Sequence, residues 1–466
     1  MRKTKIVATI GPASESYEQL ETLAKAGVNV FRLNFSHGTH EWHANVIKRI
    51  KRLNKEHPGK YAILLDTKGP EIRSGDLKVP VEVEPGDTVT FSTRAGDYAK
   101  TGKIGVSYDA FVNDVEVGEK ILVDSGVMSC KVSGKTDTDV VCEVVDGGEI
   151  TSRRHLNIPG KDVSLEAITE KDWADIAFGV EMGVDFIALS FVRHSTEIYE
   201  LKKYLKDHHN KAAVIAKIES FEATNNLEEI VQAADGVMVA RGDLGAEIEM
   251  AEVPGWQLQI VQTAAHYKKP VIIATHMLES MIEHPVPTRA EVTDISAAVW
   301  QSADAVMLSG ETANGAYPVR AVETMRDIVK VAERANSTEE VRDLPVLHER
   351  EAFALMACTM PLDLPEVEAI VVITRSGQTA RFVSSFRPGV PVFAFTNETK
   401  TRHKLQLVWG VNSFLIDFSS EPEKTIERAE AAFLQCHPDW AGRKYVLVSD
   451  CIVEDKFIQA VQVRDL

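Results

Sequence analysis

Residues 213–219 read AVIAKIE and residues 236–243 read GVMVARGD, two short apolar runs that each end in charged side chains. Short β-branched apolar runs of this kind predict strands that are buried on both faces. Residues two apart share a face of a strand, so we expect Lys217 to point with Glu219 and Arg241 with Asp243. Charged groups are costly inside a sheet unless they are paired or bind a metal ion. These strand ends therefore predict the rim of an active site.

Eight such strand-like runs occur along the chain, and amphipathic stretches such as SYEQLETLAKAG fill several of the gaps between them. The runs cover residues 5–11, 28–35, 62–69, 185–191, 213–219, 236–243, 270–276 and 305–311. Eight alternating β and α units predict a (β/α)8 TIM barrel of the α/β class, whose active sites lie at the carboxyl ends of the strands. Polar clusters lie at those ends, so the two predictions agree.

The regular spacing breaks once, where residues 70–160 are rich in Gly, Pro and Asp turns and in alternating runs such as VEVEPGDTVTF. This pattern predicts a small all-β domain inserted in a βα-loop on the catalytic face, where it could close as a lid. After residue 343 the strand and helix patterns restart, which predicts a separate open α/β domain. We therefore predict a catalytic barrel at 1–69 and 161–343, an inserted β lid domain at 70–160, and a C-terminal α/β regulatory and assembly domain at 344–466.

The composition limits the partners of this chain of 466 residues. A formal charge of −17 argues against non-specific binding to nucleic acid or to an anionic membrane, and no run reaches membrane-spanning length. Five scattered cysteines without a CxxC motif predict the reduced thiols of a cytoplasmic protein, not a disulfide framework or a zinc site. MRKTKIVATIG enters a predicted strand at once, so we expect no leader peptide.

Glu219 and Asp243 are candidate Mg²⁺ ligands, because Mg²⁺ often binds one or two protein carboxylates and keeps its other positions for water or substrate. Lys217 beside Glu219 favours phosphoryl transfer, for which a lysine near a carboxylate-bound metal ion is well suited. Ordinary salt-bridged rim residues are the alternative. Gly242 and Gly245 flank Asp243 at a strand-to-helix turn, which could offer backbone N–H groups to an anion or be a tight turn only.

A second candidate cation site lies at the ends of two earlier strands. Arg32 suits a phosphoryl group, and Asn34 and Ser36 offer oxygens to a hard cation. Asp66 and Thr67 end the next strand and could complete that site. A polar barrel rim without a ligand is an equally good interpretation of the spacing.

Two segments mark the hinges of the inserted domain. DTKGPEIR (66–73) leads into it and places Arg73 towards the cleft, and TEKD (169–172) places Lys171 near the returning hinge strand. At the last two barrel strands, Thr275, Ser309 and Glu311 could relay a proton. Helix capping is the alternative role for Ser309, since serine is a favoured N-cap type.

The C-terminal domain contains one candidate anion site. TRSGQT (374–379) follows a predicted strand and opens a helix, so that Thr374, Ser376, Gly377 and Thr379 form a plausible phosphate cradle. An ordinary capped helix is the alternative.

Together and in order, these motifs resemble the pyruvate kinase family. The matching segments are RLNFSHGTHEWH, LDTKGPEIR, AKIES, MVARGDLGAEI, ATHMLESM, PTRAEVTDISAAV and MLSGETANGAYP. The resemblance covers the barrel closely, the inserted domain loosely and the C-terminal domain moderately. It implies a phosphotransferase of glycolysis that depends on Mg²⁺ (or Mn²⁺) and K⁺ and converts phosphoenolpyruvate and ADP to pyruvate and ATP. It also implies a homotetramer, the common assembly of the family.

The resemblance assigns roles to the candidate residues. The implied catalytic residues are Lys217, Arg32, Thr275, Arg73, Ser309 and Glu311. The implied substrate contacts are Arg32, Lys217, Gly242, Asp243 and Thr275. The implied nucleotide contacts are Asn34, His37, Arg73 and Lys171. The implied metal ligands are Glu219 and Asp243 for Mg²⁺ and Asn34, Ser36, Asp66 and Thr67 for K⁺.

Regulation and alternatives complete these expectations. Glu71 implies K⁺ dependence, because relatives with Lys at this position can dispense with K⁺. The last glycine is Gly442, so we expect no Gly-rich C-terminal loop for fructose 1,6-bisphosphate, and we hypothesise regulation by a monophosphate at Ser376–Thr379 or none.

Another Mg²⁺-dependent barrel enzyme, such as a lyase or aldolase, is the runner-up, and the lid insertion argues against it. Intact Lys217 argues against an inactive sensor or scaffold.

Overall fold

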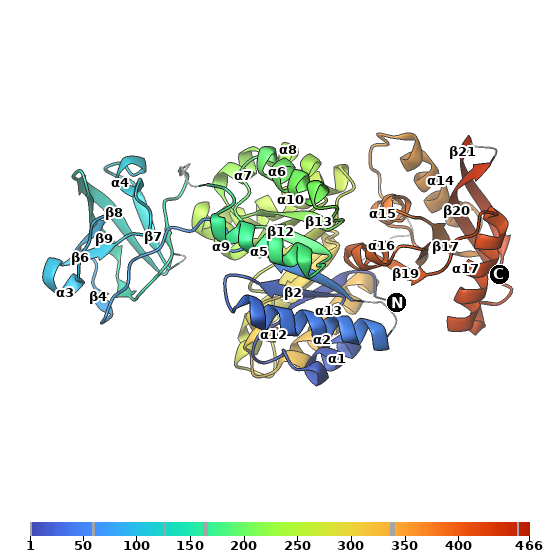
Figure 1. Cartoon of the computed structure of the whole chain (residues 1–466), viewed down its shortest axis with the longest axis horizontal. Coiled ribbons are helices and arrows are strands. Elements are labelled where there is room, and N and C mark those ends of the chain that lie inside the picture. Colours follow the sequence, from blue (N-terminus) through green and yellow to red (C-terminus); the bar gives the residue numbers. More distant parts are fainter. Residues whose placement is uncertain (1, 58–60, 125, 162–165, 336–340, 454–455) are drawn as a thin grey trace.

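The structure of this chain is a computed structural model, and it describes residues 2–57, 61–124, 126–161, 166–335, 341–453 and 456–466. Three bodies lie in a row, with a barrel in the middle, a small β domain at one end and an α/β domain at the other (Figure 1). The barrel is closed by eight parallel strands in the order β1-β16-β15-β14-β13-β12-β3-β2. The predicted fold class, a (β/α)8 barrel with an inserted β domain and a C-terminal α/β domain, is confirmed.

Each barrel strand matches one predicted run and ends before that run does. The strands are β1 (Lys5–Thr9), β2 (Val30–Asn34), β3 (Ala62–Asp66), β12 (Phe186–Leu189), β13 (Ala213–Ile218), β14 (Gly236–Ala240), β15 (Val271–Ala274) and β16 (Ala305–Leu308). The prediction that Arg241 and Asp243 share a strand face is wrong, because both lie in the helix α9 (Arg241–Glu247) that starts where β14 ends. Ser36 likewise lies in a turn after β2.

Helices surround the barrel and bury their apolar faces on the strands. They are α1 (Tyr17–Ala26), α2 (His40–Glu56), α5 (Glu170–Glu181), α6 (Ser195–Asp207), α7 (Phe221–Asn225), α8 (Leu227–Ala233), α10 (Val253–His266), α11 (Arg289–Trp300), α12 (Gly310–Ala313) and α13 (Pro318–Ala335), with the 3₁₀ turns η1 (Met250–Glu252) and η2 (Glu279–Ile282). Capping boxes start α5 at Thr169 and α11 at Thr288, which satisfies backbone N–H groups at both helix starts. These local signals set where the helices begin.

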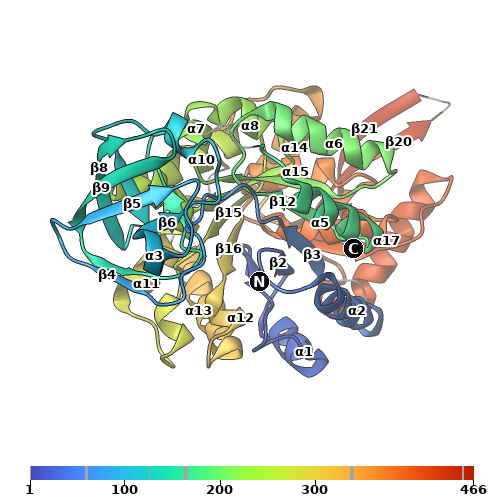
Figure 2. The same ribbon diagram turned by 60° about the vertical axis from the view of Figure 1, so that its left-hand side comes forward.

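The inserted domain stands over the carboxyl end of the barrel and comes forward when the molecule is turned (Figure 2). Its strands are β4 (Val81–Val83), β5 (Thr88–Ser92), β6 (Lys103–Gly105), β7 (Lys120–Val123), β8 (Met128–Lys135), β9 (Asp139–Asp146), β10 (Gly148–Ile150) and β11 (Leu156–Asn157), with the short helices α3 (Tyr98–Thr101) and α4 (Phe111–Asp114). Six of these strands form one sheet, and β10 pairs with β4. The domain has its own apolar core around Phe91 and Phe111.

The C-terminal domain is a five-stranded sheet in the order β19-β18-β17-β20-β21 with helices against it. Its elements are α14 (Glu349–Asp363), β17 (Val367–Ile373), α15 (Gln378–Ser385), β18 (Val392–Thr396), α16 (Thr399–Lys404), η3 (Leu405–Leu407), β19 (Val411–Leu415), α17 (Pro422–Cys436), η4 (Pro438–Trp440), β20 (Lys444–Val453) and β21 (Lys456–Asp465). The antiparallel strand β21 was not predicted. Leu407 of this domain packs with the apolar residues inside the barrel, so the two domains share part of a core.

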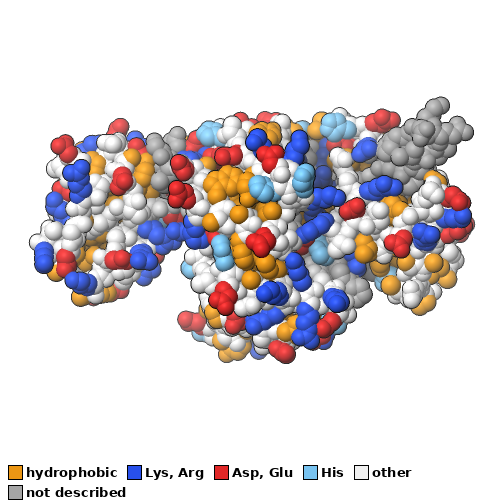
Figure 3. All heavy atoms as spheres, viewed as in Figure 1, with side chains coloured by type: hydrophobic (Ala, Val, Ile, Leu, Met, Phe, Trp, Pro, Cys, Tyr) orange, Lys and Arg blue, Asp and Glu red, His pale blue; other side chains and the backbone are white. Residues whose placement is uncertain are grey.

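The surface of the molecule is mixed in charge. Figure 3 shows Lys and Arg side chains gathered along the groove between the barrel and the C-terminal domain, on the face in view. None of the helices in the described part of the chain combines the length and the apolar character that crossing a membrane requires.

Candidate active site

Four charged side chains form a buried network at the carboxyl end of the barrel. Lys217 Nζ lies 2.7 Å from Glu219 Oε1 and 3.1 Å from Asp66 Oδ1. Arg32 Nε donates to Asp66 Oδ2 over 2.6 Å. Each of the four residues is less than one-tenth exposed, so solvent screens their charges little. The three strands β2, β3 and β13 thus bring together residues that are far apart in the sequence.

Two hydroxyl groups that the sequence analysis missed complete this network. Ser190 Oγ accepts a hydrogen bond from Lys217 Nζ over 2.7 Å and donates to the carbonyl oxygen of Thr67 over 2.6 Å. Thr9 Oγ1 accepts from Arg32 Nη1 over 2.8 Å. Both hydroxyls lie where apolar strand runs end, which is the signal that singled out the other site residues. Applying that rule to all eight runs would have found them.

The charges in this network shift the pKa values of its members. Burial raises the pKa of the Asp66 carboxyl, but Arg32 and Lys217 outweigh burial and bring that pKa below its ordinary value. Burial lowers the pKa of Lys217, but Asp66 and Glu219 outweigh burial and raise it above the ordinary value. Burial raises the pKa of Glu219 to about 7, although Lys217 acts in the opposite direction. Lys217 is therefore a fixed positive charge, and Glu219 changes its charge near neutral pH.

Glu219 and Asp243 fit a divalent cation. Glu219 is fully buried, and its Oε1 has no partner of hydrogen-bond geometry, although it makes the ion pair with Lys217. Glu219 Oε2 accepts from the backbone N–H of Phe191 over 2.7 Å, which fixes the carboxylate. Asp243 is half-buried and contributes to the electrostatic environment of Glu219. Two carboxylates, one of them fixed by the backbone, suit Mg²⁺, which leaves other positions to water and substrate.

The candidate K⁺ residues lie at the ends of β2 and β3. Asn34 stands opposite Asp66 in the register of these strands, and Asn34 Oδ1 accepts from the backbone N–H of Ser36 over 3.1 Å. Thr67 is buried, and its hydroxyl accepts from the backbone N–H of Ser190 over 3.0 Å. Both oxygens of Asp66 face cations of the network. Asn34, Ser36 and Thr67 therefore supply the neutral oxygens at this end of the two strands.

Thr275 occupies a strained turn that other residues hold in place. Thr275 and His276 have φ values of 66° and 53°, in the left-handed region that β-branched residues such as Thr rarely adopt. Arg241 Nη2 donates to the carbonyl oxygen of Thr275 over 2.6 Å, and the backbone N–H of Gly242 donates to Thr275 Oγ1 over 2.8 Å. Arg241 in turn pairs with Asp294 at 2.7 Å. The strain is thus maintained by a specific set of polar contacts.

Glu311 binds backbone groups at the ends of the last two barrel strands. Its Oε1 accepts from the N–H of Leu278 over 2.9 Å, and its Oε2 accepts from the N–H of Ser309 over 2.7 Å. Burial raises the pKa of the Glu311 carboxyl. Ser309 occupies the N-cap position of α12 but makes no side-chain capping bond. Within the described residues no hydrogen bond joins Glu311 or Ser309 to Thr275.

The hinge residues lie around the base of the inserted domain. Arg73 Nε donates to Glu71 Oε2 over 2.7 Å, and Arg73 Nη1 donates to the carbonyl oxygen of Arg153 over 2.7 Å. Lys171 Nζ donates to the carbonyl oxygen of Phe35 over 2.8 Å, next to the candidate K⁺ residues. His37 is exposed beside the same turn. Arg73 thus pairs within its hinge strand, whereas Lys171 contacts the end of β2.

A buried carboxylate that the sequence analysis did not single out ties the first hinge to the barrel. Asp172, fully buried at the start of α5, accepts hydrogen bonds from the backbone N–H groups of Lys68 and Gly69 over 3.1 and 3.0 Å. Its other oxygen caps the helix at Thr169. The capping-box pattern at Thr169 and Asp172 was the signal available in the sequence.

The candidate anion loop of the C-terminal domain lies far along the chain from this network. Gly377 has a φ of 81°, and its N–H donates to Thr374 Oγ1 over 3.0 Å. Ser376 Oγ accepts from the N–H of Gln378 over 3.3 Å at the start of α15. Thr379 is buried in the first turn of that helix. The four residues form one compact turn between β17 and α15.

Comparison with known proteins agrees with this geometry. A family model described as "Pyruvate kinase, barrel domain" matches residues 1–322, and one described as "Pyruvate kinase, alpha/beta domain" matches residues 351–454. The chain is 48% identical over 433 residues to the chloroplastic pyruvate kinase isozyme G of Nicotiana tabacum, covering 92% of this chain and 76% of the relative. It is 45% identical over 419 residues to the pyruvate kinase of Staphylococcus saprophyticus, covering 88% of this chain and 71% of the relative.

A solved structure supports the same assignment. The crystal structure of a pyruvate kinase from Cryptosporidium parvum superposes with a TM-score of 0.91 at 33% identity and covers 99% of this chain and 96% of that one. Both domain models match, and the relatives extend over most of the chain. The chain therefore belongs to the pyruvate kinase family, the phosphotransferases that convert phosphoenolpyruvate and ADP to pyruvate and ATP in glycolysis.

Proposed function

We propose that this enzyme depends on Mg²⁺ (or Mn²⁺) and on K⁺, and that the network around Lys217 is its catalytic centre. The observation that carries the proposal is the buried ion pair between Lys217 and Glu219 at 2.7 Å, with Asp66 and Arg32 on its other side. Buried charges in this number are costly unless they serve a ligand or one another. Phosphoryl transfer requires positive charge and positioning more than covalent chemistry by the protein.

The roles follow from charge and position. Lys217 and Arg32, buried cations on adjacent parts of the rim, hold and stabilise the transferring phosphoryl group. Glu219 and Asp243 would hold Mg²⁺, which when bound supplies Lewis acidity for the oxygen of the enolate. The backbone N–H groups of Gly242 and Asp243, at the start of α9, would receive the substrate carboxylate, for which the Gly242 N–H exchanges its bond to Thr275 Oγ1.

Proton delivery and the nucleotide side complete the proposed centre. Thr275, held by Arg241 in its strained turn, lies beside Gly242 and marks the side on which enolpyruvate is protonated. Glu311 and Ser309 support the neighbouring turn. Asn34, His37, Arg73 and Lys171 are the proposed contacts on the nucleotide side. Asn34, Ser36, Asp66 and Thr67 are the proposed K⁺ ligands.

The decisive experiment measures pyruvate formation from phosphoenolpyruvate and ADP with Mg²⁺ and K⁺ present, by coupling to lactate dehydrogenase. Lys217→Met is expected to lower kcat by about 10²-fold or more, as removal of a preorganised electrostatic group does. Lys202→Met is the matched control, because Lys202 lies on the outer helix α6 and makes an ion pair with Asp235. It is expected to keep the wild-type kcat.

The outcomes separate the proposal from its competitors. Equal loss in both lysine variants would mean that Lys217 acts through folding only. Turnover of phosphoenolpyruvate that does not need ADP would favour the lyase interpretation, and Mg²⁺-dependent nucleotide binding without turnover would favour the sensor. Full activity after removal of all divalent cations would contradict the proposed metal dependence.

We also propose a cytoplasmic homotetramer whose C-terminal domain responds to a phosphomonoester, or to no effector. The cytoplasm is supported by the odd number of cysteines without a CxxC pair. The tetramer is supported by exposed apolar side chains on α10 and η1, among them Met250 and Leu258. The effector is supported by the compact turn at Thr374, Ser376, Gly377 and Thr379. Activation by fructose 1,6-bisphosphate that Ser376→Glu abolishes would contradict the effector proposal, and light scattering tests the assembly.

A further inference from the structure

A cation-rich cavity lies between the barrel and the C-terminal domain, at the end of the barrel opposite the candidate active site. Its walls come from the amino ends of β15 and β16, from the segment after α13, and from α15 with the residues that follow it. Five cationic side chains line it, namely Lys268, Lys269, Arg342, Arg381 and Arg387. Asp304 is the one carboxylate among the described residues of the lining.

Two of the five cations have carboxylate partners. Lys268 Nζ lies 3.0 Å from Glu351 Oε2, and both residues are buried. Arg387 Nη2 lies 3.3 Å from Asp304 Oδ1 and donates to the carbonyl oxygen of Ser302 over 2.7 Å. These pairs neutralise Lys268 fully and Arg387 in part.

The other three cations have no such partner. Lys269 donates to the carbonyl oxygens of Gln232 and Ala234 over 3.1 and 2.5 Å, which are neutral groups. Lys269, Arg342 and Arg381 form no ion pair within the described part of the chain. All three are half-buried, so the cavity holds an excess of positive charge in a protein whose net charge is −17.

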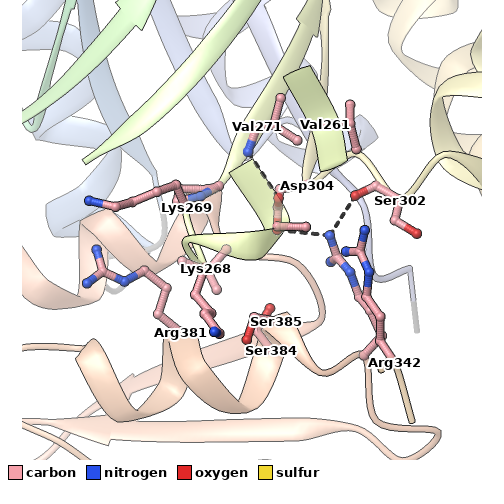
Figure 4. A pocket seen from close by; sticks show the side chains of 14 residues that line it. Val261, Lys268, Lys269, Val271, Ser302, Asp304, Arg342, Arg381, Ser384 and Ser385 are labelled. Atoms are coloured by element: carbon pink, nitrogen blue, oxygen red, sulfur yellow. Dashed lines mark hydrogen bonds and ion pairs between the residues drawn. The ribbon is translucent and has the colours of Figure 1, made fainter. Parts of the chain in front are cut away.

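Several buried donors in the cavity are also unused. Arg387 Nε and Nη1 and Arg381 Nε are buried without a hydrogen-bond partner in the described structure. The guanidinium of Arg387 lies 4.4 Å from the ring centroid of Trp409, which orients its plane. Figure 4 shows Lys269 and Arg381 on one side of the cavity and Arg342 on the other. The unused donors of Arg381 and Arg387 are groups that a small multivalent anion would satisfy.

The electrostatic effects agree with the geometry. Burial and, to a smaller extent, the neighbouring Arg387 lower the pKa of Arg342 to about 10, although Asp304 acts in the opposite direction. Burial likewise lowers the pKa of Lys269 to about 8, with Arg381 acting in the same direction. Both shifts mean that the protein without an anion keeps these cations at a cost in folding free energy.

We propose that this cavity binds a phosphate group through Arg342, Arg381 and Arg387. The guanidinium fork matches the oxygens of a phosphate group, and a dianion offsets most of the excess charge. Arg342 lies in the segment that links the barrel to the C-terminal domain, whereas Arg381 and Arg387 belong to the C-terminal domain, so the bound group would connect that segment to α15. The site differs from the turn at residues 374–379, because that turn precedes α15 and the cavity lies at the carboxyl end of the same helix.

Thermal unfolding of the full chain tests the site. Wild type and Arg342→Gln are compared in inorganic phosphate and in chloride of equal ionic strength, with circular dichroism to confirm folding. In chloride, Arg342→Gln is expected to melt at or above the wild-type temperature, because it removes a half-buried cation that has no ion-pair partner and lies near Arg387. In phosphate, the wild type is expected to gain stability and Arg342→Gln to lose about half of that gain or more. A purely structural arginine would instead lower the melting temperature in both salts.

Two further variants make the result decisive. Arg375→Gln changes a cation in the 374–379 turn and is expected to keep the full phosphate response. Phosphate bound at the candidate active site affects all variants alike and cancels in the comparison. Arg381→Gln repeats the test from another element if Arg342→Gln fails to fold. The proposal would be overturned if both cavity variants gained as much stability in phosphate as the wild type does. It would also be overturned if the wild type melted at the same temperature in phosphate and in chloride.

The source of the phosphate group is read from a second titration. Inorganic phosphate and a small phosphomonoester such as glycerol phosphate are each added to the wild type and to Arg342→Gln. If inorganic phosphate stabilises the protein at a lower concentration than glycerol phosphate does, the ligand is the free ion. If glycerol phosphate acts at the lower concentration, the ligand is a phosphorylated metabolite. With either compound, the wild type must gain more stability than Arg342→Gln; equal gains would contradict the proposed site.

Discussion

Lys217 Nζ donates a hydrogen bond to Ser190 Oγ over 2.7 Å, which joins the carboxyl ends of the adjacent strands β13 and β12. Ser190 passes the interaction on to the backbone at Thr67, where the hinge of the inserted domain begins. The position of the central ammonium is therefore set by a neutral hydroxyl as well as by carboxylates. This relationship makes Ser190 a positioning residue, which can be tested apart from Lys217.

Ser190→Ala is expected to lower kcat by about tenfold, because a hydrogen bond to a charged group contributes roughly 1.5–3 kcal/mol. The KM for phosphoenolpyruvate should change less than kcat. Ser220→Ala is the control, since Ser220 caps α7 at the neighbouring strand end and is expected to cost about 1 kcal/mol of stability without changing kcat. A wild-type kcat in Ser190→Ala would show that Lys217 is positioned by its ion pairs alone.

Binding of Mg²⁺ should weaken as the pH falls through 7. Burial raises the pKa of Glu219 to about 7, so below that pH a proton occupies the carboxylate and competes with the metal ion. Calorimetric titration with Mg²⁺ alone should show the dissociation constant rising about tenfold per pH unit below 7.

Two variants identify the titrating group in that experiment. Glu219→Gln should bind Mg²⁺ weakly at every pH, because its neutral amide lacks the charge. Glu247, whose pKa burial also raises to about 7, lies in the same region and bonds to Asn157 over 2.7 Å. Glu247→Gln should keep the pH dependence. Loss of the pH dependence in Glu247→Gln would show instead that Glu247 is the titrating group.

Activity should depend on K⁺, and Glu71→Lys should relieve that dependence. Glu71 pairs with Arg73 at 2.7 Å and with Lys68 at 3.6 Å at the first hinge, so a lysine there adds positive charge near the nucleotide side. The wild type is expected to lose about tenfold or more of its kcat in buffer free of K⁺ and Na⁺, whereas Glu71→Lys should lose much less.

The exposed residue Glu82 on β4 supplies the matched control for that substitution. Glu82→Lys makes the same change of charge within the inserted domain and should leave the K⁺ dependence unchanged. Near-full activity of the wild type without monovalent cations would remove the basis for the proposed K⁺ site.

Loosening the turn at Thr275 should reduce catalysis more than substrate binding. Positive φ values at Thr275 and His276 cost about 1–3 kcal/mol each, and Arg241 holds the turn through its bond to the Thr275 carbonyl. Arg241→Gln is expected to lower kcat by about tenfold, with a smaller change in the KM for phosphoenolpyruvate. Asp294→Asn, which removes only the negative charge opposite Arg241, should have an intermediate effect. Equal changes in kcat and KM would place Arg241 in binding instead.

The barrel and its rim could be predicted because their signals are local. Each apolar run is long enough to form a buried strand, and residues such as Lys217 and Glu219 stand two apart at the end of one. The pairing of Arg241 with Asp243 on a strand face could not be predicted correctly. Strand and helix meet at Ala240, and the sequence pattern carries no sharp signal for that boundary.

The sequence by itself determined the eight βα units, the inserted β domain and most of the charged residues at the strand ends. Continuous apolar runs, alternating runs and helical amphipathicity are all patterns among neighbouring residues. The tertiary structure alone decided which charges meet. Asp66 faces both Arg32 and Lys217 because barrel closure places β3 beside β2 and near β13. Contacts between residues distant in the chain depend on the register and closure of the strands, and a pattern within one segment contains neither.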